Sequence, residues 1–266
     1  MECHNIIKNL KINKEKSIGE VVIVVEGEND EFRLLKKIFT KILDYNYISL
    51  KRNKVLQHEF KSKSNKNSTV IIANTNSSSI KSIINDGEYK DKLYKLLKGE
   101  YQKSLKNIPI YILWDRDKNK DEKNDATKKD YETALETFAN SRDNKYEMNG
   151  ILLLSYPCHE SYNLSNFKKQ LWREKFATSD ECKKQFNSSQ YTIKKMDENT
   201  LKLAVENMNR SLLNYGIRSY DPSDFKRTNK TVFRKEEEIF KEKKYFDALS
   251  LISIMFIDLG IIENVE

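Results

Sequence analysis

Four short runs of apolar residues stand out in the first 165 residues of the chain, at 21–25, 70–73, 108–114 and 151–154. Each run has the length of a strand and is rich in Val, Ile or Leu, without alternating polar positions. Continuous apolar runs of this kind are typical of strands that are buried on both faces, as in a parallel sheet. A weaker strand is expected at 47–50.

Between these runs, apolar residues recur at helical spacing, most clearly at 32–43, directly after the first run. Strands that alternate with helices predict an α/β fold, in which helices flank a parallel, Rossmann-like sheet. Further helices are expected from about residue 79, at 89–101 and at 130–139, and exposed loops at 51–68 and 118–129.

The pattern changes beyond residue 165, where strand-like runs disappear and helical periodicity dominates, as at 201–213 and 236–249. A segment of about 100 residues is long enough to form a subdomain. We therefore expect a polar lead-in over 1–19, an α/β domain over 20–165 and a helical C-terminal subdomain over 166–266.

The chain is basic, with 48 Lys and Arg against 40 Asp and Glu among 266 residues and a net charge of +8. Such a charge favours a polyanionic partner such as nucleic acid, because Lys and Arg displace counterions from a phosphate backbone. Solvated lysines on an ordinary surface would give the same composition. Charge alone leaves the two interpretations equally open.

Several classes of protein are excluded by composition. No apolar run reaches the roughly 18–20 residues of a membrane span, so no membrane association is expected. The first residues lack the order of a signal peptide. The three cysteines show no C-x-x-C spacing, which argues against a disulfide framework or a zinc ribbon. We interpret the protein as cytoplasmic.

Acidic residues follow three of the expected strands. Glu26 comes directly after the first, Asp115 and Asp117 end the third, and Glu160 lies a few residues past the fourth, while Asp30 lies four residues after Glu26. Ligands of open parallel sheets bind beyond the carboxyl ends of the strands, so these carboxylates could converge on one edge. Converging carboxylates repel one another unless a cation neutralises them, and oxygen ligands suit Mg²⁺ or Mn²⁺.

Simpler interpretations stay open for each acidic motif. Asp30 taken alone is more often a helix cap than a metal ligand. Asp115-x-Asp117 also occurs in haloacid-dehalogenase phosphatases and in nucleotide-sugar transferases. The phosphatases usually place a nucleophilic Asp after the first strand, where this chain has Glu26. Receiver domains, with an acidic pair after the first strand, fit less well.

The combined motifs resemble a known family. Val24-Val25-Glu26-Gly27-Glu28-Asn29-Asp30, then a long helix, then Leu113-Trp114-Asp115-Arg116-Asp117 is similar to a TOPRIM domain, the catalytic fold of topoisomerases, bacterial primases and several nucleases. The resemblance covers about residues 20–165. Within the family the chain most resembles the overcoming-lysogenization-defect (OLD) nucleases and PARIS-like phage-defence effectors.

The resemblance implies roles for the acidic residues. Glu26 would be a metal ligand or general base, Asp115 and Asp117 metal ligands, and Asp30 and Glu160 ligands of a second metal ion. Two such ions, Mg²⁺ or Mn²⁺, can clamp the attacking and leaving oxygens of a phosphodiester displacement, with water as the nucleophile. OLD-type sites also use a lysine downstream, which this sequence does not single out.

The chain departs from the family in ways that bear on its partners. It has no G-x-x-x-x-G-K-[ST] phosphate loop, so an ATPase would have to be a partner chain, as in the PARIS system. No placed tyrosine nucleophile supports a topoisomerase, and no zinc ribbon supports a primase.

We therefore expect a metal-dependent endonuclease that cuts nucleic acid, with RNA such as tRNA slightly favoured over DNA, in anti-phage defence. It would work with a partner ATPase, and a homo-oligomer stays open. One alternative is a non-catalytic TOPRIM-fold subunit that binds nucleic acid or a partner. Another is a Mg²⁺-dependent phosphatase or phosphotransferase with an aspartyl-phosphate at Asp115.

Other reactive residues receive structural roles. Cys158 and His159 flank Glu160, but no spacing supplies the further ligands of a zinc site. Arg116 would point away from the two aspartates if the chain is extended there, and form a salt bridge. The basic stretch over 51–66 is interpreted as a solvated loop, with phosphate contact as the alternative.

Overall fold

The structure is a computed structural model of the chain, and it describes eight segments. The helix expected at 89–101 lies outside them, as does the first part of the loop expected at 118–129. The described residues are 10–27, 29–52, 55–75, 80–84, 108–117, 125–142, 150–217 and 225–264.

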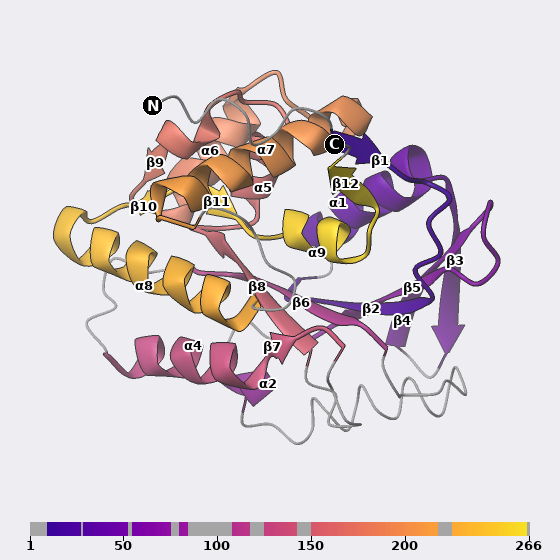
Figure 1. Ribbon diagram of the computed structural model, residues 1–266, viewed down its shortest axis with the longest axis horizontal. Coiled ribbons are helices and arrows are strands. Elements are labelled where there is room, and N and C mark those ends of the chain that lie inside the picture. Colours follow the sequence, from indigo (N-terminus) through magenta and orange to yellow (C-terminus); the bar gives the residue numbers. More distant parts are fainter. Residues whose placement is uncertain are drawn as a thin grey trace.

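A twisted sheet runs through the centre of the molecule (Figure 1). Its four middle strands are parallel, in the order β8 (Gly150–Tyr156), β6 (Ile110–Asp115), β2 (Glu20–Val25) and β5 (Thr69–Asn74). These are the four strands that the apolar runs predicted. Val21–Val24 of β2 are fully buried, because helices cover both faces of the sheet.

Antiparallel strands extend this sheet at both edges. On one side lie β4 (Val55–Ser62) and β3 (Tyr45–Arg52), which pair with each other, and β4 also pairs with β5. On the other side β11 (Leu249–Ser250) and β7 (Ala139–Asn140) each pair with β8. The fold is thus a mixed α/β fold with a mostly parallel central sheet flanked by helices, compatible with a Rossmann-like arrangement.

The exposed loop expected at 51–68 is wrong, because most of this segment is the strand β4 and the end of β3. Its polar composition hid the strand. Phe60 is fully buried under the helix that follows β2, while its neighbour Lys61 is exposed. The buried ring of Phe60 and hydrogen bonds to two neighbouring strands hold this strand in the sheet, although Glu59 and Lys61 on either side of Phe60 are charged.

Helices lie on both faces of the sheet (Figure 1). On one face are α1 (Asp30–Lys37), which continues as a π-helical turn over Ile38–Ile42, and α7 (Glu198–Asn214) and α9 (Ser253–Asp258). On the other face are α2 (Ile80–Ile84) and α4 (Asp125–Thr137). The remaining helices are α5 (Glu160–Ser165), α6 (Ser179–Ser188) and α8 (Phe225–Lys243), with 3₁₀ turns at Leu171–Arg173 and Ile193–Lys195.

The C-terminal hundred residues are less purely helical than expected. They contain the short strands β9 (Lys175–Phe176), β10 (Phe246–Asp247), β11 and β12 (Ile262–Asn264), the last paired with β1 (Leu10–Ile12). The predicted helix at 201–213 is confirmed as part of α7, whereas α8 ends at Lys243, before residue 249.

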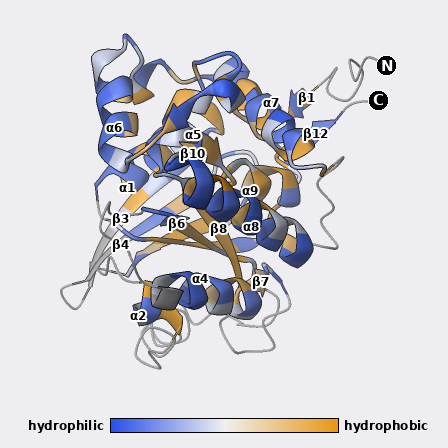
Figure 2. Ribbon diagram, turned by 90° about the vertical axis from the view of Figure 1, so that its left-hand side faces the viewer, coloured by the Kyte–Doolittle hydropathy of each residue, from blue (hydrophilic) through white to orange (hydrophobic). Residues whose placement is uncertain are grey.

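One apolar core joins both parts of the chain. It includes side chains of the central strands together with Leu201, Val232 and Phe256 from three C-terminal helices. Figure 2 shows the central strands as the most hydrophobic layer, with mixed helices outside. Whether residues 166–266 form a unit of their own stays a prediction. None of the helices that the structure describes combines the length and the apolar character needed to cross a membrane.

Candidate metal centre

The carboxyl ends of the parallel strands meet at one edge of the sheet. Val25, the last residue of β2, pairs with Leu113 of β6, and Asp115 of β6 pairs with Ser155 of β8. Glu26, Asp115 and Glu160 leave the strands at this edge or just beyond it. The register therefore brings acids from distant parts of the sequence together.

Glu26 is half-buried and lies among other negative charges. Burial raises its pKa most, and the nearby carboxylates of Asp115, Glu31 and Asp117 raise it further, to about 8. A glutamate that holds its proton near neutral pH can act as a general acid or base, and a nearby cation would favour its charged form.

Asp115, the last residue of β6, is largely buried. Burial raises the pKa of its carboxyl group, while a contact with His159 opposes that shift. The His159 Nδ1 atom lies 3.4 Å from Asp115 Oδ2. The backbone carbonyl of Asp115 is held by the Tyr131 hydroxyl, which donates a hydrogen bond of 2.9 Å from α4.

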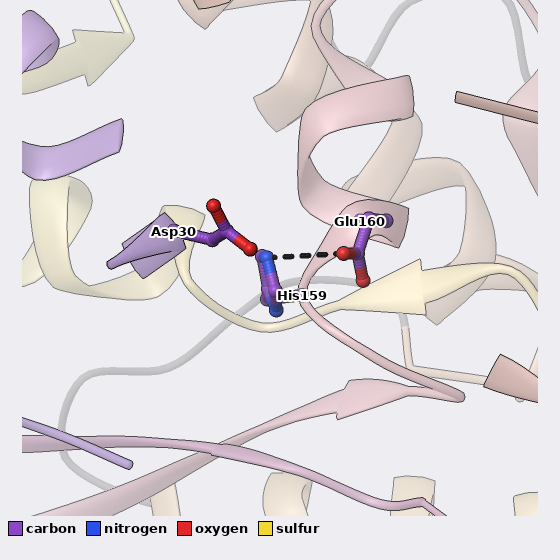
Figure 3. A group of neighbouring side chains, drawn as sticks. All are labelled: Asp30, His159 and Glu160. Carbon is purple, nitrogen blue, oxygen red and sulfur yellow. Dashed lines mark ion pairs between the residues drawn. The ribbon is translucent and has the colours of Figure 1, made fainter. Parts of the chain in front are cut away.

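A second group of ligand atoms lies on the other side of His159. Asp30, His159 and Glu160 each offer one ligand atom, and these atoms lie within 4.8 Å of one another. Figure 3 shows His159 between the two carboxylates, and its Nε2 atom is 3.3 Å from Glu160 Oε1. Since Nδ1 faces Asp115, the one imidazole joins both groups of acids.

The charge of His159 follows from its carboxylate neighbours. Burial lowers the pKa of its imidazole, but the hydrogen bond and charge of Asp115 and the charge of Glu160 outweigh that effect and raise it to about 9. The imidazolium therefore occupies the place where the acids need positive charge. From the sequence, His159 was expected to have only a structural role, and its contacts with the acids were not predicted. Its position next to Glu160 could have indicated them.

Asp30 and Glu160 are the first residues of α1 and α5. The N-cap position of α1 is Asn29, whose side chain makes no capping hydrogen bond, so Asp30 is not the cap that the simpler interpretation suggested. Asp30 is exposed, and its Oδ1 atom lies 3.5 Å from Arg33 Nη1. Partial positive charge at a helix start favours an acid at both positions.

Asp117 lies at the rim of the site. It is exposed and accepts a hydrogen bond of 2.7 Å from the Ser179 hydroxyl at the start of α6. The strand ends at Asp115, so the extended path assumed for both aspartates does not continue through Asp117. Arg116 between them is buried and pairs with Glu237, which confirms the predicted salt bridge.

Two more charged residues belong to this edge and were missed. Glu31 is buried, and its Oε2 atom would lie 3.0 Å from a Cβ atom added at Gly27, so this carboxylate packs closely against the glycine. Lys183 of α6 is half-buried; burial lowers its pKa, but Glu160, Asp115 and Asp117 outweigh that and raise it. No spacing in the sequence links Lys183 to the acids.

The donor set fits a divalent cation. It consists mainly of carboxylates, the oxygen ligands that suit Mg²⁺ and Mn²⁺, together with one imidazole, a ligand of softer transition metals. Glu160 Oε2 is buried and has no hydrogen-bond partner among the described residues. Buried polar atoms are normally satisfied, so this oxygen is suited to a ligand. The cluster could hold a metal ion.

The two cysteines that the structure describes take no part in this group of acids. Cys158 and Cys182 are buried free thiols in a small apolar cluster. The Cys158 thiol donates a weak hydrogen bond to the Ser179 carbonyl at 3.8 Å. Their packing agrees with the structural role expected for Cys158.

Comparisons with known proteins add no assignment. No protein-family model, no curated protein and no solved structure matches the chain.

Proposed function

We propose that this protein is a divalent-metal-dependent TOPRIM-type endonuclease. The observation that carries the proposal is the gathering of acids at the carboxyl edge of the sheet, where Glu26 lies near Asp115, and His159 contacts Asp115 on one side and lies with Asp30 and Glu160 on the other. Carboxylates that repel one another in a partly buried site are costly unless they serve a cation or a proton transfer. Both uses are parts of metal-assisted hydrolysis of a phosphodiester.

Each residue then has a role that follows from its surroundings. Asp115, Asp117, Asp30 and Glu160 would hold Mg²⁺ or Mn²⁺, which supplies charge for the transition state and an activated water. His159 must lose its proton to act as a ligand, so metal binding would release a proton from it.

Glu26 and Lys183 would act on the reacting groups. Glu26 keeps its proton near neutral pH without a cation, because its pKa is about 8; a bound metal ion would favour the charged form, which can take a proton from the attacking water. Lys183 carries positive charge beside the acids, where it can contact a phosphate oxygen, and it is our candidate for the lysine of OLD-type sites.

The substrate class rests on charge and on the resemblance. A net charge of +8 favours a polyanion, and the family resemblance favours RNA such as tRNA over DNA. The resemblance to phage-defence effectors gives the proposed setting, anti-phage defence. A partner chain would supply the ATPase, because this chain carries no phosphate loop of its own.

The proposal is tested by cleavage and metal binding together. Wild type, Glu26→Gln and the control Glu132→Gln, an exposed acid on α4, are incubated with tRNA, single-stranded RNA, plasmid and linear DNA in Mg²⁺, Mn²⁺ or EDTA. We expect metal-dependent cutting that is lost only in Glu26→Gln, and calorimetric binding of Mn²⁺ by wild type.

Two results would count against the proposal. Cutting that persists in EDTA would refute a metal-dependent reaction. Absence of both Mn²⁺ binding and cutting would refute the metal centre, and nucleic-acid binding in that case would favour a non-catalytic subunit.

A further inference from the structure

Arg116, the residue between Asp115 and Asp117, is the largest fully buried side chain of the described residues. Its Nε atom donates a hydrogen bond of 2.9 Å to Glu237 Oε1 on α8, 121 residues further along the chain. The guanidinium lies 4.4 Å from the centre of the Tyr131 ring. An arginine cannot lose its charge, so a buried one depends on its carboxylate partner.

The same residue holds the chain on both sides of itself. The backbone N–H of Arg116 donates to the Ser155 carbonyl of β8 at 2.8 Å, and its Nη1 atom donates to the Asp117 carbonyl at 3.4 Å. With Tyr131 donating to the Asp115 carbonyl, both aspartates have their backbone fixed from the buried side. Their carboxylates point to the other side, where Asp115 contacts His159 and Asp117 accepts a hydrogen bond from Ser179.

We propose that Glu237 and Arg116 are positioning residues, through which α8 sets the orientation of Asp115 and Asp117 and so the affinity of the site for a divalent cation. This inference rests on the proposed metal centre. Glu237 fixes the guanidinium, the guanidinium fixes the backbone of the aspartates, and the backbone directs the carboxylates. Residues that orient metal ligands typically change metal affinity by about 10- to 100-fold when replaced.

The neighbouring Glu236 provides a matched control. It lies on the same helix and is also fully buried, but it accepts hydrogen bonds from the Tyr215 hydroxyl at 2.6 Å and the Asp247 N–H at 3.1 Å. Neither of these donors contacts the segment from Asp115 to Asp117. Glu236→Gln and Glu237→Gln are thus the same exchange at neighbouring buried positions, and they differ in which part of the structure they release.

The experiment compares the full-length wild type with Glu237→Gln, Glu236→Gln and Arg116→Lys. Calorimetry with Mn²⁺ measures affinity per folded molecule, and hydrogen exchange measures protection of the Arg116 amide. We expect Glu237→Gln to bind Mn²⁺ about 10- to 100-fold more weakly and to exchange that amide faster. Glu236→Gln should stay within about twofold of wild type, and Arg116→Lys, which keeps charge without the planar fork, should fall between.

Each outcome decides one question. If wild type binds Mn²⁺ and both glutamine variants match it, the positioning role is overturned while the metal centre stands. If Glu237→Gln does not fold, Arg116→Lys with wild-type affinity overturns it. If wild type binds no Mn²⁺, the proposed function fails, and the amide exchange alone shows whether Glu237 fixes the loop.

Discussion

One buried acid, Asp258, and a group of several acids lie at opposite ends of the same parallel strands. At the amino end of β6, Asp258 is surrounded by donors: the Tyr111 hydroxyl, the Ser141 hydroxyl at 2.7 Å and Arg142 Nη1 at 2.6 Å. Burial and Asp258 raise the pKa of Tyr111, so its hydroxyl keeps its proton and remains a donor.

The carboxyl end of the strands is arranged differently. Glu26 and Asp115 face each other and Glu31, and His159 is shared between Asp115 and Glu160. Glu160 also has a buried oxygen without a hydrogen-bond partner in the described part of the chain. More acids lie here, and among the described residues each has fewer donors than Asp258.

The difference separates an acid that stabilises the fold from acids that serve chemistry. A buried carboxylate with charged and neutral donors is fully satisfied, so it fixes the structure around it. Carboxylates held against one another store repulsion, which a cation or a proton can relieve. The candidate site is therefore marked by carboxylates that repel one another, and not by the number of acids.

The largest expected effect comes from removing one acid of the unsatisfied group. Glu26→Gln should lower the rate of nucleic-acid cleavage by on the order of 10³-fold, since several kcal/mol of transition-state stabilisation are lost. Its melting temperature in EDTA should not fall, because one repelling carboxyl group is gone. A cleavage rate within tenfold of wild type would contradict the catalytic role of Glu26.

Removing the charge of Asp258, which is satisfied by its donors, should instead reduce stability and leave cleavage unchanged. Asp258→Asn should lower the free energy of unfolding by about 2–3 kcal/mol, because charge-assisted hydrogen bonds from Arg142 and its neighbours are lost. Urea denaturation measures this change. Cleavage per folded molecule should stay at the wild-type value, and a specific loss of cleavage would mean that the two ends are coupled.

The smallest expected effect is a pH dependence of stability in EDTA. The pKa of Glu26 rises from 4.5 to about 8 on folding, so the folded state keeps a proton that the unfolded chain releases. Its contribution is therefore fully present below about pH 4.5 and is lost as the pH rises toward 8. Solvent screens this half-buried group and reduces the effect.

Thermal unfolding of wild type and Glu26→Gln between pH 5 and pH 8 tests this sign. The melting temperature of wild type should fall relative to Glu26→Gln as pH rises, and Mg²⁺ should reduce the difference. A difference that stays constant over this range would show that Glu26 titrates normally.

How far the sequence predicts the fold depends on how each strand is covered. The strands β2, β5, β6 and β8 are buried on both faces, so their central residues are all apolar. Each of these strands can therefore be predicted from its own segment of sequence. The strand β4 is held by its neighbours and by the buried ring of Phe60, which stands between the charged residues Glu59 and Lys61. Its pattern is that of a loop until its partners are known.

The candidate site divides in the same way. Glu26, Asp115 and Glu160 follow buried strands, and the parallel arrangement alone predicts that such ends meet. Lys183 comes from α6, and no local pattern says that this helix packs beside the acids. His159 was visible next to Glu160, but its contact with Asp115 depends on how α5 begins.

The sequence by itself therefore determined the parallel sheet and the edge at which its acids lie. Burial on both faces shows in each apolar run, and the alternation of strands with helices implies that the strands are parallel. The tertiary structure alone decided which imidazole and which lysine join the acids, and that Glu237 holds the loop between Asp115 and Asp117 through Arg116. Those contacts join residues up to 121 positions apart. Their geometry is set by how the helices pack, and the sequence of one helix does not show which residues it will pack against.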